Sequence, residues 1–340
     1  MMPTLPDPVH LLELSEAEAI FGDILEGYYS DGDVSSFLLG LSQRGETGSE
    51  IAGAAKAAAQ KMISIESTDD TIDVCGTGGD GQNSLNISTA VALVVAATHV
   101  PVAKHGNRAS SSLAGAADTL EALGIKIDLT PKQATACLKK TGITFLFAQT
   151  YHPALARIAP LRRKIGKPTI FNLIGPLVNP AHVKRQFIGV AAPRYLDAYS
   201  EAIRLLDFEA VMLVSGDDPF DELSICKASS ALMIRKHENP DSGIPEGLIR
   251  LTPADVNLDS HPLSSIRGKD AAYNAQALLD LLDGKASAYR DAVLMNAAGA
   301  LIVAEKCWDW DDGVNVASNI IDSGRAKEVF ENWKAFTQTC

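Results

Sequence analysis

The stretch Thr71-Ile72-Asp73-Val74-Cys75-Gly76-Thr77-Gly78-Gly79-Asp80-Gly81 marks a change in the character of the chain. The first 66 residues of the chain carry helical patterns and no strand signal. After it, short runs rich in β-branched and apolar residues alternate with helical segments. Strands that alternate with helices favour a mostly parallel sheet covered on both faces. The sequence therefore predicts a small all-helical N-terminal domain followed by a large α/β domain.

The expected elements follow from the same periodicities. A capping box of Ser15 and Glu18 is expected to begin the first helix, with further helices over 33–43 and 47–62. Residues 153–180 begin as a helix and continue as a Pro- and Gly-rich stretch with little strand character, and residues 237–247 are expected to form a surface loop. Strands are expected at 71–75, 100–103, 144–148, 186–190, 210–215 and 231–235, with helices at 88–98, 112–123, 131–140, 195–206 and from 269 to the end.

The overall composition excludes several classes of protein. A length of 340 residues indicates about two domains, at roughly 150 residues per domain. The net charge of −12 disfavours a nucleic-acid partner or an anionic membrane surface, although a few cations can still form a cleft for a small anion. Five widely spaced cysteines without a C-x-x-C pair indicate free thiols in a reducing compartment. With no signal-peptide pattern and no apolar run longer than residues 90–97, the expected location is the cytoplasm.

The glycine-rich loop is the strongest local motif. Four glycines within residues 76–81 follow a strand and lead to a helix start at Asn86, Ser88 and Thr89. Glycines let the backbone approach a ligand, and loop amides with a helix N-terminus then face one anion. The motif is neither a Walker P-loop nor G-x-G-x-x-G. From the glycines alone, phosphate binding and a plain tight turn remain open, while Asp80 suits a ribose hydroxyl or a hydrated metal.

A basic run, Lys104-His105-Gly106-Asn107-Arg108, follows the second expected strand and is followed by Ser110-Ser111-Ser112. Residues just past the carboxyl ends of neighbouring parallel strands converge on one crevice. Three possible cations, an amide and three hydroxyls beside the glycine loop suit a polyanion such as a pyrophosphate. The alternative is a solvated basic loop whose serines cap the next helix.

An acidic run, Asp217-Asp218-Pro219-Phe220-Asp221-Glu222, follows another expected strand. Four close carboxylates repel one another unless a cation offsets them, and Mg²⁺ takes one or two carboxylates together with phosphate oxygens. The alternative is an acidic solvent loop. Elsewhere, Arg162 suits a substrate carboxylate, or equally the polar face of its helix. The sequence shows no metal-ligand spacing of histidines and no acid/base carboxylate pair.

The order of these motifs resembles the anthranilate phosphoribosyltransferase family over nearly the whole chain. The resemblance rests on residues 37–47, on 76–81 with 86–89, and on 104–108, 117–124 and 169–180. It implies transfer of the phosphoribosyl group of phosphoribosyl pyrophosphate to the amine of anthranilate, with release of pyrophosphate, in tryptophan biosynthesis. It also implies up to two Mg²⁺ ions and a homodimer joined through the helical domain. That domain would comprise residues 1–66 joined by about 153–180, and the α/β domain residues 67–152 and 181–340.

The resemblance also implies roles for individual residues. Anthranilate would contact Gly76, Asn107 and Arg162, with His105 and Pro176 nearby. Ser88 and Glu222 would ligate one Mg²⁺ ion, and Asp221 and Glu222 a second. No residue is assigned as an acid or base, since a neutral aromatic amine is the nucleophile. Phosphoribosyl pyrophosphate would be held by Gly76, Gly79, Asp80, Ser84, Asn86, Ile87, Ser88, Thr89, Lys104, His105, Gly106, Asn107, Arg108, Ala109, Ser110, Ser111, Ser112 and Ala116.

The chain departs from the family pattern at a few positions. Ala116 stands where a serine is common, Pro219-Phe220 where Gly-Leu is usual, and Ser215 where a histidine is common. Gln149 replaces a usual proline, and Lys167-Pro168 stands where an arginine is frequent. These changes bear on affinity and loop mobility and remove no implied ligand.

Two other functions are compatible with the same fold. A pyrimidine nucleoside phosphorylase would have glycine and lysine motifs that differ in sequence from residues 76–81 and 104–108 of this chain. A non-enzymatic homologue that binds nucleic acid would need a basic surface and an eroded metal site. The net charge and the intact Asp221-Glu222 pair speak against that second function.

Overall fold

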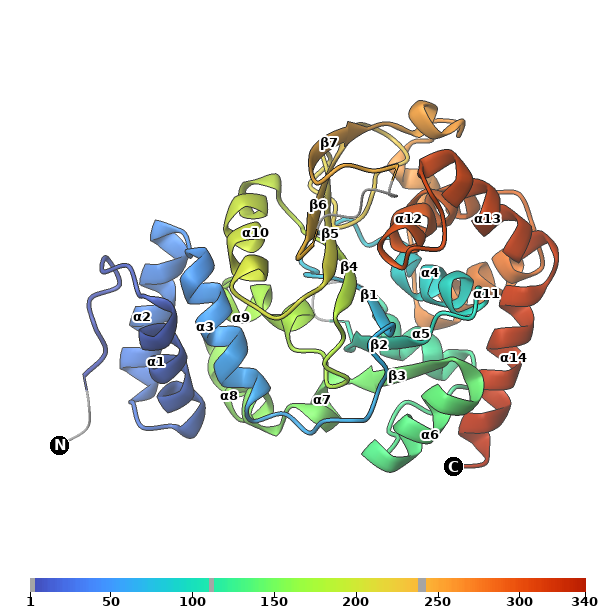
Figure 1. The fold of residues 1–340 in the computed structure, drawn as a ribbon. Helices are drawn as coiled ribbons and strands as arrows, with labels where there is room; N and C mark the ends of the chain where they lie inside the picture. Colours follow the sequence, from blue (N-terminus) through green and yellow to red (C-terminus); the bar gives the residue numbers. More distant parts are fainter. Residues whose placement is uncertain (1–3, 110–112, 238–242) are drawn as a thin grey trace.

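The structure is a computed structural model that describes residues 4–109, 113–237 and 243–340. Its N-terminal part is a layer of helices: α1 (Leu14–Glu26), α2 (Asp31–Arg44) and α3 (Gly48–Ala59). The later helices α8 (Pro153–Ile165) and α9 (Ile170–Leu173) pack against this layer (Figure 1). The prediction that the first 66 residues are helical is therefore confirmed, and the segment that lacked strand character joins the same layer.

The expected cap of the first helix is wrong. Helix α1 begins one residue before Ser15, and its N-cap residue Glu13 makes no side-chain capping bond. A capping box forms instead at α3, where the Glu50 amide donates to Thr47 Oγ1 at 3.2 Å and the Thr47 amide donates to Glu50 at 2.9 Å. The spacing of residue types alone did not distinguish the two sites, because Ser15 already lies within the helix.

The described residues form one seven-stranded sheet in the order β3-β2-β1-β4-β5-β6-β7. The first five strands are parallel, and β6 and β7 add antiparallel at one edge. The mostly parallel sheet is thus confirmed. The strands are β1 (Ile72–Gly76), β2 (Val102–Gly106), β3 (Ile143–Phe147), β4 (Arg185–Gly189), β5 (Ala210–Gly216), β6 (Ser229–Arg235) and β7 (Gly247–Leu251).

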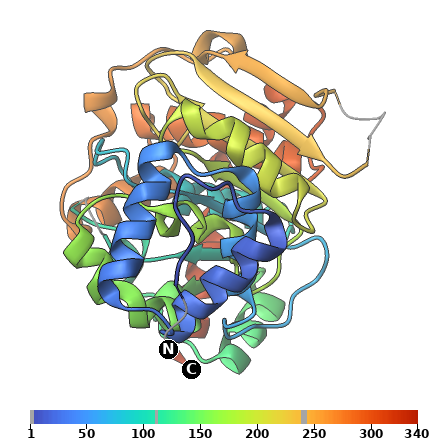
Figure 2. The same cartoon turned by 90° about the vertical axis from the view of Figure 1, so that its left-hand side faces the viewer.

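Strand β7 was missed from the sequence. It follows the Pro- and Gly-rich stretch directly and is short, with Leu248 and Arg250 exposed on one face. A five-residue edge strand after such a stretch carries too little alternation to distinguish it from a loop. Figure 2 shows the β6–β7 ribbon at one border of the molecule, while the N-terminal helices lie over a face of the sheet.

Helices cover both faces of the sheet, which explains why apolar residues on its central strands are buried on both sides. On β5, Met212 and Val214 face one hydrophobic core, whereas Val211 and Leu213 face the other. The second core includes the N-terminal helices and α10 (Leu196–Arg204). The first core is built with α4 (Ile87–Ala96), α5 (Ala116–Ala122), α6 (Pro131–Thr141), α11 (Ala271–Leu282), α12 (Ala288–Val303), α13 (Trp310–Asp322) and α14 (Arg325–Gln338).

Short elements complete the chain. Among the described residues, the expected helix over 112–123 begins only at Ala116. The four-residue helix α7 (Ala148–Tyr151) joins β3 to α8. Single 3-10 turns lie at η1 (Gly175–Leu177), η2 (Pro193–Tyr195), η3 (Pro253–Val256) and η4 (Leu263–Ile266).

Candidate active site at the carboxyl ends of the strands

The glycine-rich loop and the acidic loop meet at the carboxyl ends of the parallel strands, where ligands bind in open α/β sheets. The Gly78 amide donates a 2.8 Å hydrogen bond to Asp221 Oδ2. A Cβ atom on Gly76 would lie 2.3 Å from the same oxygen, and one on Gly189 would lie 1.5 Å from the Asp221 main-chain oxygen. The Asp221 main chain therefore excludes a side chain at the end of β4, whereas at the end of β1 a side chain would displace the Asp221 carboxylate.

The glycine loop itself is held in a left-handed conformation. Gly78 and Gly79 have φ angles of +67° and +80°, which L side chains rarely adopt. A Cβ atom at either position would meet nothing within 4 Å, so the loop borders open space. Its far end is tied to the acidic loop, because Gln82 Nε2 donates to the Asp218 main-chain oxygen at 2.6 Å.

Three acidic side chains, those of Asp80, Asp221 and Glu222, lie close together at this loop. Burial, together with the charge of Asp80, raises the pKa of Asp221 to about 7. Burial and the charge of Asp221 raise the pKa of Glu222 well above its usual range, and the positive charge of Lys104 opposes this shift. Asp80 Oδ2 is buried with no hydrogen-bond partner among the described residues. Carboxylate oxygens crowded in this way are stabilised by a cation.

These oxygens are the donor type that Mg²⁺ prefers. Within the described ranges, however, no group of three or more His, Cys, Asp and Glu side chains is arranged to hold a metal ion unaided. Asp221 and Glu222 therefore fit a magnesium ion that takes its remaining ligands from a bound phosphate and water, which is the usual mode for this ion.

The other two carboxylates of the acidic run are already neutralised. Arg250 Nη1 donates to Asp217 Oδ1 at 2.9 Å, and Lys227 Nζ lies 2.5 Å from Asp218 Oδ1. The expectation of four mutually repelling carboxylates therefore holds only for the Asp221–Glu222 half of the run.

The basic run does not present three free cations to the crevice. Lys104 is only 2% exposed, and its Nζ donates to the Val74 main-chain oxygen at 2.6 Å and to Ser88 Oγ at 3.1 Å. Its charge therefore lies beneath the site and faces Ser88. Arg108 is turned outward, where it pairs with Asp118 at 2.9 Å and also with Glu121.

The remaining possible cation of the run, His105, is uncharged near neutral pH. It is buried, and its Nε2 lies 3.1 Å from Nε2 of the buried His152. Burial lowers the pKa of His105 to about 3, reinforced by His152, and burial lowers that of His152 to about 4. One ring donates and the other accepts, so this wall of the site is polar and uncharged near neutral pH.

Arg162 is a cation without a partner in the described part of the chain. It lies partly buried on α8, and its guanidinium makes no hydrogen bond or ion pair with any other described residue. Desolvation by burial lowers its pKa. Leaving a charged donor partly buried and unpaired is costly, so the position fits a guanidinium that awaits an anion.

The start of α4 is fixed from three sides. Asn86 Oδ1 accepts from Thr119 Oγ1 at 2.6 Å and from Asn274 Nδ2 at 3.1 Å, while Tyr289 donates to the Asn86 main-chain oxygen at 3.0 Å. Ser84 is held by a bridge to Arg267. These contacts place the helix N-terminus beside the glycine loop, where its free amides favour an anion.

Other expected site residues are placed as follows. Ile87 and Thr89 are buried in the core, whereas Ser88 is partly exposed. Asn107 Oδ1 accepts the Arg108 amide at 2.8 Å, and Pro176 lies buried in η1. The Ala109 amide donates to Asp118 at 3.0 Å, and Ala116 is the first residue of α5. Residues 110–112 lie outside the described part of the chain.

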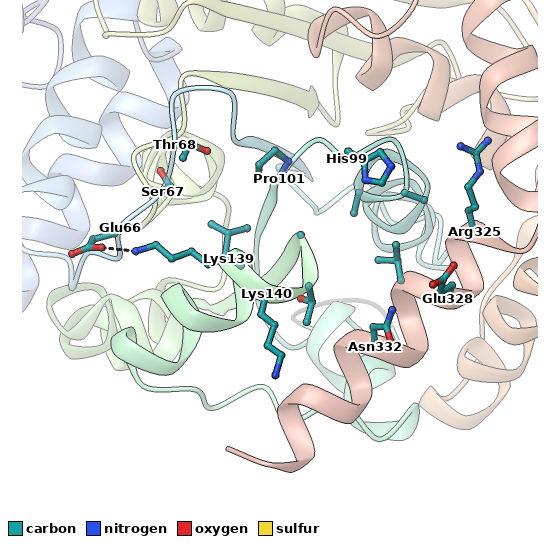
Figure 3. Close-up of a pocket in the computed structure, with 16 residues that line it drawn as sticks. Glu66, Ser67, Thr68, His99, Pro101, Lys139, Lys140, Arg325, Glu328 and Asn332 are labelled. Carbon is teal, nitrogen blue, oxygen red and sulfur yellow. Dashed lines mark hydrogen bonds and ion pairs between the residues drawn. The ribbon is translucent and has the colours of Figure 1, made fainter.

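A cavity of about 760 Å³ lies at the other end of the strands, where their amino ends are (Figure 3). Pro101 and Gly142, just before β2 and β3, line it together with α14 residues such as Arg325 and Glu328. Because it opens at the amino ends of the strands, it is separate from the glycine loop. The size of a cavity is here a poor guide to the site of chemistry.

Comparison with known proteins agrees with this geometry. Residues 10–62 match the helical bundle domain of a glycosyl transferase family, and residues 68–327 match its a/b domain. An anthranilate phosphoribosyltransferase of Novosphingobium aromaticivorans is 51% identical over 334 residues, which cover 98% of this chain and 99% of the relative. The chain belongs to the anthranilate phosphoribosyltransferase family.

Two solved anthranilate phosphoribosyltransferase structures share the fold. The structure from Thermus thermophilus is 35% identical, with a TM-score of 0.89 over 98% of this chain and 100% of the other. The Saccharomyces cerevisiae structure, in complex with PRPP and Mg, is 27% identical, with a TM-score of 0.85 over 96% and 93% of the two chains. In the described ranges of this family member, no helix is both long and apolar enough to span a bilayer.

Several residues that shape the site were missed from the sequence. Asp73, Asn179 and Gln186 are buried polar residues beside the site, and Gly189 makes room for the acidic loop. A charge in the middle of an apolar run was the available signal for Asp73. His152 carried no signal, because its partner His105 is 47 residues away in the chain.

Proposed function

We propose that this chain transfers the 5-phosphoribosyl group from phosphoribosyl pyrophosphate to the amine of anthranilate and releases pyrophosphate. The observation that carries the proposal is the pair formed by the partly buried Asp221 and the buried Glu222 beside an open glycine loop. Family membership supports the reaction, and the PRPP and Mg complex of the yeast relative supports the donor and the cofactor. Together these observations support a polyanion and a hard cation bound at the same edge of the sheet.

The donor is proposed to lie between the glycine loop and the start of α4. Gly76, Gly79 and Asp80 border it on one side, and Asn86 and Ser88 on the other. The remaining proposed donor contacts are Ser84, Ile87, Thr89, Lys104, His105, Gly106, Asn107, Arg108, Ala109, Ser110, Ser111, Ser112 and Ala116. Because Lys104 is buried, we propose that its charge acts on the donor through Ser88 and the carboxylates.

Up to two Mg²⁺ ions are proposed, held by Ser88 and Glu222 and by Asp221 and Glu222. Bound magnesium would offset the charge that grows on the departing pyrophosphate. The Gly78 amide donates to Asp221 Oδ2, so a cation that binds through this oxygen would share it with the glycine loop. This hydrogen bond would couple cation binding to the position of the loop.

Anthranilate is proposed to bind with its carboxylate at Arg162, beside Asn107 and Gly76, with His105 and Pro176 nearby. A guanidinium holds a planar carboxylate through two parallel hydrogen bonds. The neutral His105 adds a polar contact and no second charge. The nucleophile is a neutral aromatic amine, so no strong base is required before attack.

Most of the rate is proposed to come from holding the two substrates in line. Such positioning supplies up to ~7–11 kcal/mol in favourable cases. The residues present fit this mechanism. Asp221 and Glu222 would hold the cations that offset the charge of the donor, and Arg162 would orient the acceptor.

We also propose the domain division and a homodimer. The helical domain would comprise residues 1–66 with about 153–180, and two copies would meet through it. Val9, Leu11 and Tyr28 support this, because all three are exposed apolar side chains on that part of the molecule. Light scattering after gel filtration measures the mass directly.

The activity is tested by following the loss of anthranilate fluorescence with phosphoribosyl pyrophosphate and Mg²⁺. The proposal predicts a decrease that requires all three components. Phosphorolysis of thymidine or uridine without use of anthranilate would instead identify a pyrimidine nucleoside phosphorylase.

A further inference from the structure

Strands β1 and β2 separate soon after they begin. Ile72 and Val102 are their ladder partners, and no later pair of described residues joins these two strands. By contrast, β1 stays paired with β4 as far as Gly76, and β2 stays paired with β3 as far as Gly106. The gap therefore opens between β1 and β2, and it runs toward the crevice.

Side chains satisfy the backbone groups inside the gap. The His105 amide donates to Asp73 Oδ1 at 3.1 Å, and Lys104 Nζ donates to the Val74 main-chain oxygen at 2.6 Å. Asn179 Nδ2 donates both to the Ala103 main-chain oxygen and to Asp73 Oδ2, each at 2.8 Å. Because buried backbone groups must find partners, these side chains hold the strands apart at a defined width.

The same carboxylate connects to the segment that carries Pro176. Gln186 Nε2 donates to the Pro176 main-chain oxygen at 2.7 Å and lies 3.5 Å from Asp73 Oδ2. Asp73 is fully buried, and its two carboxylate oxygens face the His105 amide and the Asn179 side chain, which are both hydrogen-bond donors. One side chain on β1 thus fixes two parts of the acceptor wall, His105 and Pro176.

We propose that Asp73 is a positioning residue, a wedge between β1 and β2 that sets the acceptor wall relative to the donor-binding glycine loop. It touches neither substrate and acts through His105, Asn179 and Gln186. The inference rests on the proposed function, since it concerns the distance between the two substrate sites. A misplacement of about 1 Å at such a site can cost roughly 10²-fold in rate.

Asp73→Asn tests the wedge with little change in volume. The new NH2 group would face either the His105 amide or Asn179 Nδ2, both of which are donors. We expect kcat/KM for anthranilate to fall by roughly 10²-fold while KM for phosphoribosyl pyrophosphate changes by less than about twofold. Amide hydrogen exchange at His105 should become faster, because its amide loses the Asp73 acceptor. This measurement tests the contact between the two strands without relying on turnover.

The chain offers a matched control in the helical layer. Glu50 is also a fully buried carboxylate, and it accepts from the Thr47 amide at 2.9 Å and the Leu12 amide at 3.2 Å. Glu50→Gln should lower the melting temperature while both KM values stay as in the wild type. If Asp73→Asn lowers stability alone and shows the same kinetics as Glu50→Gln, Asp73 is a structural residue and the proposal is wrong.

A second variant covers failure of Asp73→Asn to fold. Asn179→Ala removes one arm of the wedge and is expected to shift the same kinetic parameter in the same direction by a smaller factor. Unchanged anthranilate kinetics in this variant would also overturn the proposal. A wild-type chain without any anthranilate-dependent turnover would instead refute the proposed function, and the exchange measurement at His105 would still test the wedge.

Discussion

Asp221 Oδ2 accepts a hydrogen bond from the amide of Gly78 at 2.8 Å, so the proposed metal ligand is joined directly to the glycine loop. The contact satisfies a carboxylate that burial and the Asp80 charge would otherwise leave poorly stabilised. A cation bound through Asp221 Oδ2 would share that oxygen with the Gly78 amide. We therefore expect metal binding and the position of the glycine loop to depend on each other.

Loss of Glu222 should remove metal-supported turnover. Glu222→Ala removes a proposed ligand of both ions, and we expect kcat to fall by more than about 10²-fold at any Mg²⁺ concentration. Asp217→Asn is the matched control, because Asp217 lies in the same loop but is paired with Arg250. Wild-type kcat for Glu222→Ala at saturating Mg²⁺ would contradict the assignment.

Arg162 should govern acceptor affinity. Removing a guanidinium that pairs with a carboxylate costs on the order of 1.5–3 kcal/mol, so Arg162→Ala should raise KM for anthranilate by roughly 10- to 100-fold. KM for phosphoribosyl pyrophosphate should stay close to the wild-type value. Arg163→Ala, one residue along α8 and exposed, serves as the control. Equal anthranilate KM values for the two variants would remove Arg162 from the site.

Gly76→Ala tests the close approach of the acidic loop. The new Cβ would lie 2.3 Å from Asp221 Oδ2, so the carboxylate has to move while the main chain stays in place. We expect a higher Mg²⁺ requirement at nearly unchanged stability. Gly22→Ala is the control glycine, since a Cβ there meets nothing within 4 Å. An unaltered Mg²⁺ titration for Gly76→Ala would show that the carboxylate position is unimportant.

The His105–His152 pair predicts an acid-sensitive stability. Burial lowers the pKa values of the two residues to about 3 and about 4, so both stay neutral in the folded chain while the unfolded chain binds protons below the ordinary value of 6.5. Stability is therefore lost as the pH falls from about 6.5 toward 4. Each histidine contributes up to about 1.4 kcal/mol per pH unit of this loss.

His152→Asn isolates one histidine of the pair. The free energy of unfolding, measured by urea titration at several pH values, should fall less steeply with acid in the variant than in the wild type. Parallel pH profiles for the two proteins would mean that His152 is protonated in the folded chain.

The sequence predicted the architecture and the main loops because their signals are local. A strand that ends in glycines, such as β1, and an acidic run after a strand, such as that following β5, are visible within about ten residues. Strand β7 was missed because its alternation is too short to be distinctive.

The hydrogen bonds that connect parts of the site lacked local signals. Asn179 reaches Asp73 across 106 residues, and Leu223, next to Glu222, is held by Asn296, which is 73 residues away. The sequence also could not show which basic side chains are free to bind an anion, because Arg108 and Lys104 lie in the same short run. Only the fold shows that Arg108 is paired at the surface and that Lys104 is buried.

The decisive experiment measures anthranilate consumption and pyrophosphate release together in one reaction. With phosphoribosyl pyrophosphate and Mg²⁺, we expect equal amounts of anthranilate lost and pyrophosphate formed. Both signals should disappear on chelation of the metal or in Glu222→Ala. Pyrophosphate release without loss of anthranilate, or turnover that does not depend on the metal, would refute the proposed transfer.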